Sequence, residues 1–256
     1  MTESAFPLNH QRLPRHVAVI MDGNGRWAQR RGYPRIRGHV AGVDSVRTVV
    51  RQARKLGISY LTLFAFSEEN WQRPNLEVRA LMALLSRYLD RELKEMQDNQ
   101  IALRAIGDLK RLPGAVQQDL ARTIEATADG AKMILTLALS YGGRTEIVQA
   151  VQALAADLLS GRLKPQEIDA ALFRRYLYAP DLPDPDLLIR TSGEYRLSNF
   201  LLWQSPYTEL YVTDTLWPDF KEDDFLKALA AYQERERRFG QTREQIAALN
   251  NTSSRH

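Results

Sequence analysis

Short apolar runs that alternate with amphipathic stretches are the feature that most constrains the fold of this chain. Each run is rich in aliphatic or β-branched residues and is bounded by turn residues, and residues 17–20, VAVI, include no polar side chain. Strands as apolar as this one are buried on both faces, which is typical of parallel sheets. Six strands are predicted, at residues 16–21, 60–66, 101–106, 132–139, 186–189 and 209–213.

Helical periodicity fills most of the intervals between these runs. From residue 43 to residue 56 apolar side chains recur three and four positions apart, and Gly57 follows where a left-handed residue ends many helices. Comparable patterns cover residues 75–97, 115–128, 146–159 and 223–238. Alternating strands and helices predict one α/β domain with a mostly parallel sheet of about six strands, flanked by helices and covered on both faces.

The domain is predicted to span residues 16–240. An N-terminal extension, 1–15, precedes it, and the polar segment 241–256 is expected to be a disordered tail. The absence of cysteine excludes disulfides, cysteine-ligated metals and a thiol nucleophile, and it fits a cytoplasmic protein. No apolar run approaches about 18 residues, so neither a membrane span nor a secretory signal is expected.

Positive charge is concentrated near the N-terminus. Residues 12–37 contain seven arginines and a single acid, Asp22, so this segment has a formal charge of +6, against +4 for the whole chain. Such a field attracts phosphate groups, whether of a small substrate, a lipid or a nucleic acid. No nucleic-acid-binding module accompanies it, so we expect no nucleic acid partner.

Polar side chains follow four of the six apolar runs. The segments are DGNGRW after the first run, SEENWQR after the second, SYGGR after the fourth and RTSGE after the fifth. Ligands of open parallel sheets bind beyond the carboxyl ends of the strands. These segments therefore mark the predicted binding edge.

The segment DGNGR joins a buried strand to a predicted helix. Its two glycines permit close approach of the backbone to an anion at the helix N-terminus, which predicts a phosphate site. Gly23, Gly25 and Ala28 also fit a loose dinucleotide-binding pattern, but the second strand ends roughly 40 residues after Gly25, twice the interval of about 20 expected for that fold. A carboxylate beside a phosphate site, as Asp22 would be, is typical of Mg²⁺ binding.

Together these motifs resemble the cis-prenyltransferase (undecaprenyl diphosphate synthase) family. The segments HVAVIMDGNGRWA, FAFSEENWQRP, SYGGR, IRTSGEYRLSNFLLWQSPYTELYVTD and LWPDF, then RERRFG, occur in the family's order from about residue 16 to residue 240. The resemblance implies a Mg²⁺-dependent transferase that adds isopentenyl diphosphate repeatedly to farnesyl diphosphate with Z double bonds. Its product would be undecaprenyl diphosphate, the lipid carrier precursor for cell-wall polysaccharide.

The resemblance also assigns roles to individual residues. Asp22 would be catalytic and, with Glu209, a Mg²⁺ ligand, and Asn70 would share with Asp22 in proton removal. The starter diphosphate would be bound by Gly23, Asn24, Gly25, Arg26, Arg35, His39 and Arg73, flanked by Trp27 and Trp71. The isopentenyl diphosphate site would comprise Arg190, Arg196 and Ser198 beside the loop of Ser67, Glu68 and Glu69. Tyr195 stands where a histidine can occur in relatives, and because a phenol binds Mg²⁺ poorly it receives no metal role.

An apolar product requires an apolar space. The pattern at 75–97 has more apolar residues than one core-facing stripe needs, which predicts a wall of a hydrophobic tunnel or, alternatively, a dimer face. Ala65, Met133, Leu135 and Leu137 are the other predicted lining residues. The resemblance further implies a homodimer in the cytoplasm, with peripheral contact to the inner face of the membrane as an additional expectation.

Two other functions fit parts of the sequence. A dinucleotide-dependent oxidoreductase would use residues 23–28 and would not depend on Mg²⁺. A non-catalytic binding subunit would share the fold, but the presence of Asp22, Asn70, Arg190 and Arg196 argues against that alternative.

Overall fold

A six-stranded, wholly parallel sheet forms the centre of the computed structural model, which describes residues 8–235. Its order is β3-β4-β2-β1-β5-β6, so β3 and β6 are the edges. The aliphatic side chains of the central strands are almost wholly buried, as the apolar runs predict. The strands are β1 (His16–Ile20), β2 (Tyr60–Ser67), β3 (Ile101–Ile106), β4 (Met133–Tyr141), β5 (Leu187–Arg190) and β6 (Glu209–Val212).

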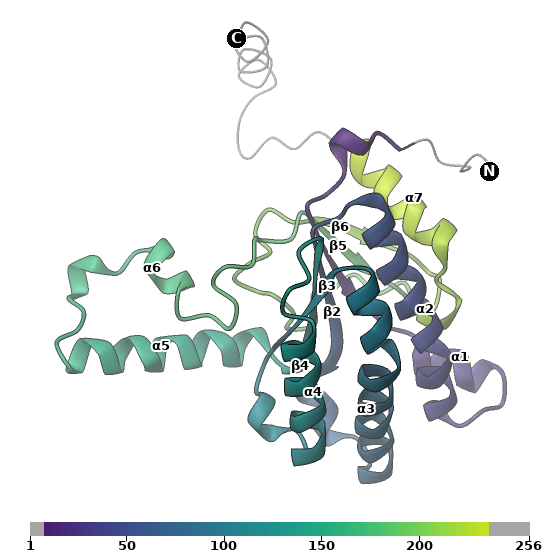
Figure 1. The fold of residues 1–256 in the computed structure, drawn as a ribbon, viewed down its shortest axis with the longest axis horizontal. Coiled ribbons are helices and arrows are strands. Elements are labelled where there is room, and N and C mark those ends of the chain that lie inside the picture. Colours follow the sequence, from purple (N-terminus) through teal and green to yellow (C-terminus); the bar gives the residue numbers. More distant parts are fainter. Residues whose placement is uncertain (1–7, 236–256) are drawn as a thin grey trace, which may run out of the picture.

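Seven α-helices connect or flank these strands in the described part of the chain. Figure 1 shows α2, α3 and α4 side by side beside the sheet, with α1 below α2 and α7 next to it, while α5 and α6 extend away as an arm. The bounds are α1 (Asn24–Arg30), α2 (Arg35–Leu56), α3 (Asn75–Asp98), α4 (Gly114–Ala126), α5 (Gly143–Leu159), α6 (Ala170–Arg174) and α7 (Glu222–Gln233). No helix of residues 8–235 is both long and apolar enough to cross a bilayer.

The two faces of the sheet are covered differently. Helices α2, α3, α4 and α7 pack on one face and form the larger apolar core with it. On the other face, Phe200 and Leu201 pack against Ile20 and Leu188, and the Phe200 ring stacks on Phe64 at 4.4 Å between centroids. Irregular chain therefore covers part of the second face, where the sequence pattern favoured helices. The reason is that α5, which follows β4, projects outward instead of lying on the sheet.

The strand order places a crevice between β1 and β5. These neighbours pair in parallel, yet the chain leaves β1 for β2 on one side and leaves β5 for β6 on the other. Connections that diverge in this way leave an opening at the carboxyl ends of the two strands, where α/β proteins bind ligands. Asp22 follows β1, and Arg190 is the last residue of β5, so both lie at this crevice.

Several predicted boundaries differ from the observed ones. The strand predicted at 60–66 includes Ser67, and its ladder with β4 shifts register around Ala65. The helix predicted at 223–238 ends at Gln233, and residues 236–238 lie outside the described part. The predicted tail at 241–256 and the first seven residues of the extension also lie outside it. Within residues 8–15, Asn9 is hydrogen-bonded to Gln233 of α7, with its amide donating at 3.0 Å.

His16 is a buried histidine that ties β1 to its neighbours. Its Nδ1 donates to the carbonyl of Pro183 at 2.7 Å, and its Nε2 accepts from the Thr62 hydroxyl at 2.8 Å, an arrangement that requires the neutral ring. Burial lowers the pKa of His16 from 6.5 to about 4, although the Pro183 carbonyl opposes this shift. The imidazole is therefore neutral at pH 7.

We expect acid to destabilise the fold through His16. Between pH 6.5 and about 4 the unfolded state binds more protons than the folded state, so the free energy of unfolding falls as the pH falls. The loss from this residue is on the order of 3 kcal/mol at the lower limit. Urea unfolding across this range should show a shallower pH slope for His16→Gln. The exposed His10→Gln is the control, and an unchanged slope for His16→Gln would contradict this prediction.

Candidate active site

Asp22 lies at the centre of the crevice and contacts two arginines from different parts of the chain. Its Oδ2 is 3.0 Å from Nη2 of Arg190 and 3.4 Å from Nη2 of Arg26, and its Oδ1 accepts from the Gly23 amide at 2.6 Å. Burial favours the protonated acid, but the hydrogen bonds from Arg190 and Gly23 outweigh it and lower the pKa of Asp22. The carboxylate is therefore ionised at neutral pH.

Backbone contacts fix the position of this carboxylate. The Asp22 carbonyl accepts from the Thr191 hydroxyl at 2.6 Å and from the Trp217 amide at 3.0 Å, which joins β1, β5 and the segment before α7. Gly23 has a φ of +104°, and a Cβ there would lie 3.0 Å or less from atoms of Leu216 and Ser192. Only glycine fits this turn without strain, as the close approach predicted for DGNGR requires.

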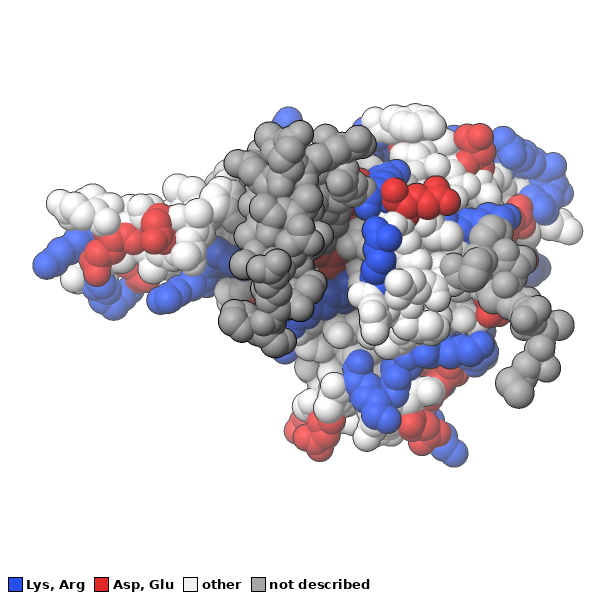
Figure 2. All heavy atoms as spheres, turned by 90° about the horizontal axis from the view of Figure 1, so that it is seen from above, with Lys and Arg blue, Asp and Glu red and all other residues white. Residues whose placement is uncertain are grey.

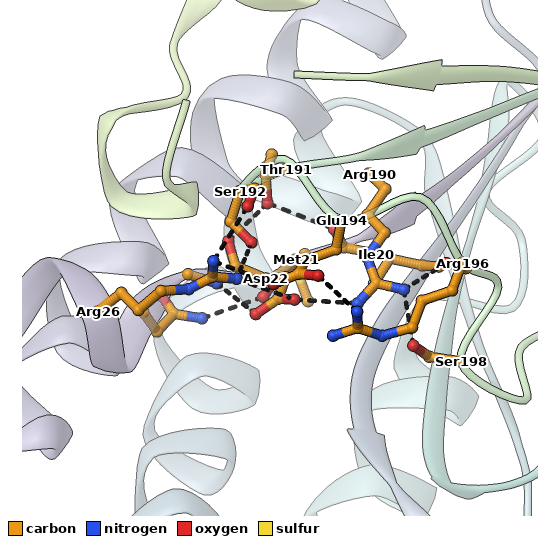
Figure 3. Close-up of polar contacts among 12 residues, drawn as sticks. Ile20, Met21, Asp22, Arg26, Arg190, Thr191, Ser192, Glu194, Arg196 and Ser198 are labelled. Atoms are coloured by element: carbon orange, nitrogen blue, oxygen red, sulfur yellow. Dashed lines mark hydrogen bonds and ion pairs between the residues drawn. The ribbon is translucent and has the colours of Figure 1, made fainter. Parts of the chain in front are cut away.

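One cluster of cations forms on the β5 side of Asp22, and Figure 3 shows its polar contacts. Nη1 of Arg190 donates to the Ser198 hydroxyl at 2.6 Å and to the carbonyl of Arg196. Glu194 forms ion pairs with both Arg196 and Arg26, the latter at 3.2 Å. The structure thus brings Arg190, Arg196 and Ser198 together, as predicted, and adds Glu194 as their internal counter-ion.

A second cluster joins the start of α2 to the start of α3. Arg35, His39 and Arg73 surround the carboxylate of Glu77, at 3.5, 3.9 and 3.1 Å respectively. Burial, then the charges of Arg73 and Arg35, lowers the pKa of His39 from 6.5 to about 4. The imidazole is therefore neutral at pH 7, and Glu77 provides the negative charge that the two guanidinium groups require.

Two glycines of α2 allow α1 to approach this cluster. A Cβ on Gly38 would lie 1.9 Å from the carbonyl oxygen of Asn24, and one on Gly42 would lie 2.4 Å from the Asn24 side-chain oxygen. The guanidinium of Arg35 covers Gly25 in the same way, because a Cβ there would lie 2.7 Å from its Cζ. The N-terminus of α1 is therefore held against the cations of α2.

Three buried polar atoms at this site have no hydrogen-bond partner among the described residues. They are the side-chain oxygen of Asn24, Nε2 of His39 and Nε of Arg190. Leaving a buried polar atom unpaired costs about 1 to 3 kcal/mol, so such atoms indicate a place where a ligand or water completes the bonding. Two of the three are potential donors, which suits an anionic ligand.

An apolar pocket with a cavity volume of about 170 Å³ opens beside this second cluster. Asn24, His39, Asn70 and Arg73 lie at its polar end. Ala65 lies in the wall of the pocket, at the point where the pairing of β2 with β4 shifts register. A bulge of this kind can turn a side chain toward a site. Its apolar lining includes Ala65, Leu81, Leu84, Leu85, Tyr88 and Leu137.

The pocket accounts for the excess of apolar side chains on α3. The sequence alone did not decide between two interpretations of that excess, a tunnel wall and a dimer face. Two of the predicted lining residues are elsewhere: Met133 and Leu135 are buried in the main core and are absent from the pocket wall. Both lie nearer the start of β4 than Leu137 does. Their role in lining a longer tunnel stays a prediction.

The loop after β2 is joined by hydrogen bonds to the region of the cation cluster on the β5 side of Asp22. Glu69 accepts from the Asn199 amide at 3.0 Å, and the amide of Ser67 donates to the Asn70 side chain at 3.2 Å. Glu68 accepts from the Thr145 hydroxyl at the start of α5. The loop of Ser67, Glu68 and Glu69 therefore borders the cluster that contains Arg190, Arg196 and Ser198.

The two tryptophans support loops and do not line the pocket. Nε1 of Trp27 donates to Asp219 at 2.6 Å, and the Arg31 guanidinium lies 4.1 Å from its ring centroid. Nε1 of Trp71 donates to the Ser140 hydroxyl at 2.9 Å, with the Phe66 ring packed on its edge. This geometry therefore does not favour direct contact of Trp27 or Trp71 with the substrate.

Glu209 lies at the opposite end of the sheet from Asp22. It pairs in register with Leu187, which pairs with Val17, so it is level with a residue five positions before Asp22. At about 3.3 Å per residue, the offset along the strands is about 16 Å. Glu209 instead accepts from Arg235 at 2.8 Å. The expectation that Glu209 shares a metal ion with Asp22 is not supported within one chain.

Asp22 is consequently the acid that the structure places at the crevice centre for a metal ion. Among residues 8–235 no three histidine or acidic side chains converge in a way that could hold a cation. Mg²⁺ commonly takes one carboxylate and completes its shell with water and phosphate oxygens. An ionised, half-buried Asp22 between two anion-binding clusters fits that donor set.

Glu77 and Glu194 are the site residues that sequence reasoning missed. Glu77 is one acid among 31 and carries no motif of its own, while Glu194 ends the RTSGE segment but received no role there. The only signal was an excess of positive charge around residues 12–37, which requires counter-ions somewhere in the fold. Which acids provide them depends on contacts between residues far apart in the sequence.

Comparisons with known proteins agree with this geometry. A family model described as "Putative undecaprenyl diphosphate synthase" matches residues 20–240. An isoprenyl transferase of Heliobacterium mobile is 52% identical over 91% of this chain and 90% of its own length. The ditrans,polycis-undecaprenyl-diphosphate synthase ((2E,6E)-farnesyl-diphosphate specific) of Vibrio cholerae is 48% identical over 94% of this chain and 97% of its own.

Solved structures show the same fold. Lavandulyl diphosphate synthase from Lavandula x intermedia, in complex with dimethylallyl diphosphate, has a TM-score of 0.87 and 42% identity, covering 90% of this chain and all of that one. A probable undecaprenyl diphosphate synthase from Campylobacter jejuni has a TM-score of 0.73 and 35% identity, covering 89% and 99%. These relatives exclude the dinucleotide-dependent oxidoreductase that residues 23–28 had left open.

Glu77→Gln should strengthen binding of inorganic pyrophosphate. The change removes the carboxylate that neutralises Arg35 and Arg73, so an incoming anion no longer competes with an internal one. We expect a gain of roughly five- to tenfold in affinity, about 1 kcal/mol, by isothermal titration calorimetry. Glu95→Gln, which removes an ion pair farther along α3, is the matched control. Weaker pyrophosphate binding by Glu77→Gln than by the control would contradict the counter-ion role.

Proposed function

The chain belongs to the cis-prenyltransferase (undecaprenyl diphosphate synthase) family, and we propose that it condenses isopentenyl diphosphate repeatedly onto farnesyl diphosphate, forming Z double bonds. The product would be undecaprenyl diphosphate, the lipid carrier precursor for cell-wall polysaccharide. One observation carries this proposal: ionised Asp22 lies between two cation clusters, and one of them opens on an apolar pocket. The name of the Vibrio cholerae relative supports the choice of starter and product.

The cluster at the pocket is assigned to the diphosphate of the allylic starter. Arg35, His39 and Arg73 would bind the phosphate oxygens, while the amides of residues 23–26 add donors at the N-terminus of α1. The unpaired Nε2 of His39 supports this assignment, because it can donate to a phosphate once Glu77 is displaced. The hydrocarbon of the starter would enter the pocket from this end.

The cluster around β5 is assigned to isopentenyl diphosphate. Arg190, Arg196 and Ser198 converge beside the loop of residues 67–69, and guanidinium groups bind phosphate oxygens in pairs. Arg26 contacts both Asp22 and Glu194, so it lies between the two clusters. This arrangement would hold the two diphosphates side by side, with the reacting carbons between them.

Mg²⁺ would be bound by Asp22 together with diphosphate oxygens. When bound, it would supply positive charge to the departing diphosphate. Asp22 is suited to this role because its depressed pKa keeps it ionised. Arg26 and Arg190, which now neutralise Asp22, would remain close enough to stabilise the same leaving group.

The reaction then follows from positioning. The C–O bond between the allylic carbon and its diphosphate breaks, the double bond of isopentenyl diphosphate forms the new C–C bond, and a proton leaves to create the next double bond. We assign that proton to the Asp22 carboxylate, and Asn70 would take part in its removal by hydrogen bonding, since an amide does not itself accept a proton. Holding both reactants at attack distance supplies a large part of the rate.

The pocket is assigned to the growing chain. Its apolar wall on α3, β2 and β4 keeps the hydrocarbon out of water, and Leu85 and Tyr88 continue that wall away from the cations. Trp27 and Trp71 are assigned to holding the loops that carry the site, since both are hydrogen-bonded away from the pocket.

We also propose a cytoplasmic homodimer with peripheral membrane contact. The arm formed by α5 and α6 stands clear of the body when seen from above, with basic and acidic side chains interspersed along it (Figure 2). Several of its apolar side chains are exposed, which favours burial against a second copy. They are Val148, Val151, Leu159 and Ile168.

Replacing Asp22 by asparagine should abolish transfer while leaving the fold intact. Loss of the charge removes the metal ligand and the proton acceptor, so we expect kcat to fall by at least about a thousandfold. The assay is incorporation of radiolabelled isopentenyl diphosphate with farnesyl diphosphate and Mg²⁺, with products resolved by chain length. Asp44→Asn, on the exposed side of α2, is the control, and absence of incorporation by the wild type would refute the proposed function.

Charges placed on the arm should dissociate the homodimer. We expect the double variant Val148→Glu/Val151→Glu to sediment as a monomer where the wild type sediments as a dimer, because two buried carboxylates per copy would be unpaired. Ala83→Glu, on exposed α3, should leave the dimer intact. A double variant that remains dimeric would place the interface elsewhere.

A further inference from the structure

One motif of the sequence has no part in the chemistry assigned to the site. The segment SYGGR, residues 140–144, joins β4 to α5 at the edge of the sheet that carries the site. Its Ser140 hydroxyl accepts from Nε1 of Trp71 at 2.9 Å. Two of its backbone amides donate to Asn199, at 2.7 Å to the carbonyl and at 2.9 Å to the side-chain oxygen. This segment therefore connects the loop after β2 with the chain after β5.

The side chain of Asn199 completes that connection. Its Nδ2 donates to Oε1 of Glu69 at 3.0 Å, while its Oδ1 accepts from the amide of Arg144. An amide can do both, whereas a carboxylate of the same shape has no proton to donate at neutral pH. Burial raises the pKa of Glu69, but the hydrogen bond from Asn199 and further bonds at the loop outweigh burial and lower it. Glu69 is therefore an ionised acceptor for the Asn199 amide.

The chain around Asn199 forms a left-handed turn. Ser198, Asn199 and Leu201 have φ values of +50°, +62° and +46°, which residues other than glycine adopt only under strain. Phe200 and Leu201 are buried, so core packing holds the turn in this conformation. Such backbone is found at sites where the surrounding contacts enforce it. The turn directs the Ser198 hydroxyl to Nη1 of Arg190, 2.6 Å away.

The two glycines of SYGGR allow the loop and the turn to approach each other. A Cβ on Gly142 would lie 2.7 Å from Oε2 of Glu68 and 2.9 Å from Nδ2 of Asn199, so a side chain there would displace both groups. A Cβ on Gly143 would lie 2.8 Å from Cγ of Leu202 and 3.2 Å from the Asn199 carbonyl oxygen. The start of α5 is thus a surface against which both segments pack.

We propose that Asn199 is a positioning residue for isopentenyl diphosphate. Its side chain holds the loop of residues 67–69 and the turn of residues 198–201 at a fixed separation, and the SYGGR segment supports both. That separation sets where Ser198 and the guanidinium groups of Arg190 and Arg196 lie relative to the loop. The inference rests on the proposed function, which assigns this cluster to isopentenyl diphosphate. Asn199 acts through these neighbours and needs no contact with the diphosphate.

Asn199→Asp tests this role with little change of shape. The new carboxylate can still accept from the Arg144 amide, but it faces the Glu69 carboxylate across the 3.0 Å that the hydrogen bond now spans, and like charges repel. Calorimetry with isopentenyl diphosphate and Mg²⁺, without an allylic starter, should show affinity lowered about tenfold by this displacement of the loop. In the transfer assay KM for isopentenyl diphosphate should rise, while KM for farnesyl diphosphate stays within about twofold, since the cluster of α2 and α3 is unchanged.

A structural role alone would give a different result. Partial unfolding lowers the concentration of active enzyme, so kcat would fall while both KM values stayed the same. Unchanged affinity for isopentenyl diphosphate in Asn199→Asp would overturn the proposal, as would an equal rise in both KM values.

Reversing the polarity of the hydrogen bond should restore binding. In Asn199→Asp/Glu69→Gln the amide at position 69 donates to the carboxylate at position 199. Glu69→Gln alone is the reference, because Glu69 itself borders the substrate. Relative to that reference, adding Asn199→Asp should cost less than about twofold in affinity, against about tenfold in the wild-type background. Equal losses in the two backgrounds would show that Asn199 does not act through Glu69.

A matched pair of glycine variants separates the hydrogen bonds from the strained backbone. Gln100, between α3 and β3, has a φ of +56°, close to the +62° of Asn199, but lies outside the site. Both glycine substitutions relieve the strain, and only Asn199→Gly also removes the bonds to Glu69 and Arg144. Asn199→Gly should therefore raise KM for isopentenyl diphosphate several-fold, and Gln100→Gly should leave it unchanged. The same KM in both variants would contradict the positioning role.

The positioning role and the proposed function fail separately. If the wild type binds isopentenyl diphosphate and Asn199→Asp binds it more weakly, but no product forms with farnesyl diphosphate, the proposed function is refuted and the positioning role stands. If the wild type elongates farnesyl diphosphate while Asn199→Asp keeps the affinity and KM of the wild type, the positioning role is refuted and the function stands.

Discussion

The ion pair between Asp22 and Arg190 is the contact around which the site is arranged. It joins residues 168 positions apart at the ends of two neighbouring parallel strands, and the backbone of Asp22 is fixed from both sides by Thr191 and Trp217. The divergence of the chain after β1 and β5 creates the opening in which this pair lies. Everything assigned to the reaction is positioned relative to it: one cation cluster on the β5 side, the other where α2 meets α3.

The arginines of the site repel one another, and acidic side chains of the same chain offset this electrostatic repulsion. Guanidinium groups gathered to bind diphosphates repel one another when no diphosphate is present. Glu77 neutralises the cluster of α2 and α3, and Glu194 bridges Arg26 and Arg196. Because His39 stays neutral in this setting, the five arginines of the site face three carboxylates and the resting site keeps only a small excess of positive charge. Ligand binding is then an exchange of one anion for another, which keeps the arginines in place without making them inaccessible.

The same architecture places two chemical environments next to each other. The crevice between β1 and β5 is charged, and the pocket beside α3 is apolar. A substrate with a charged head and a long hydrocarbon requires both. Glycines at 38 and 42 make this compactness possible, since any side chain there would push α1 away from α2 and open the cradle.

The sequence by itself determined the six strands, the principal helices and the edge of the sheet that carries the site. Those features depend on local periodicity, on turn residues and on motifs such as DGNGR, which are all readable in one dimension. The tertiary structure alone decided that Glu77 and Glu194 serve as counter-ions, that Glu209 lies about 16 Å along the strands from Asp22, and that Met133 is buried in the main core. Each of these depends on register and packing between distant segments. Local sequence patterns do not predict such contacts, because an acidic residue or a methionine looks the same in the sequence whether the fold places it in the site, in the core or on the surface.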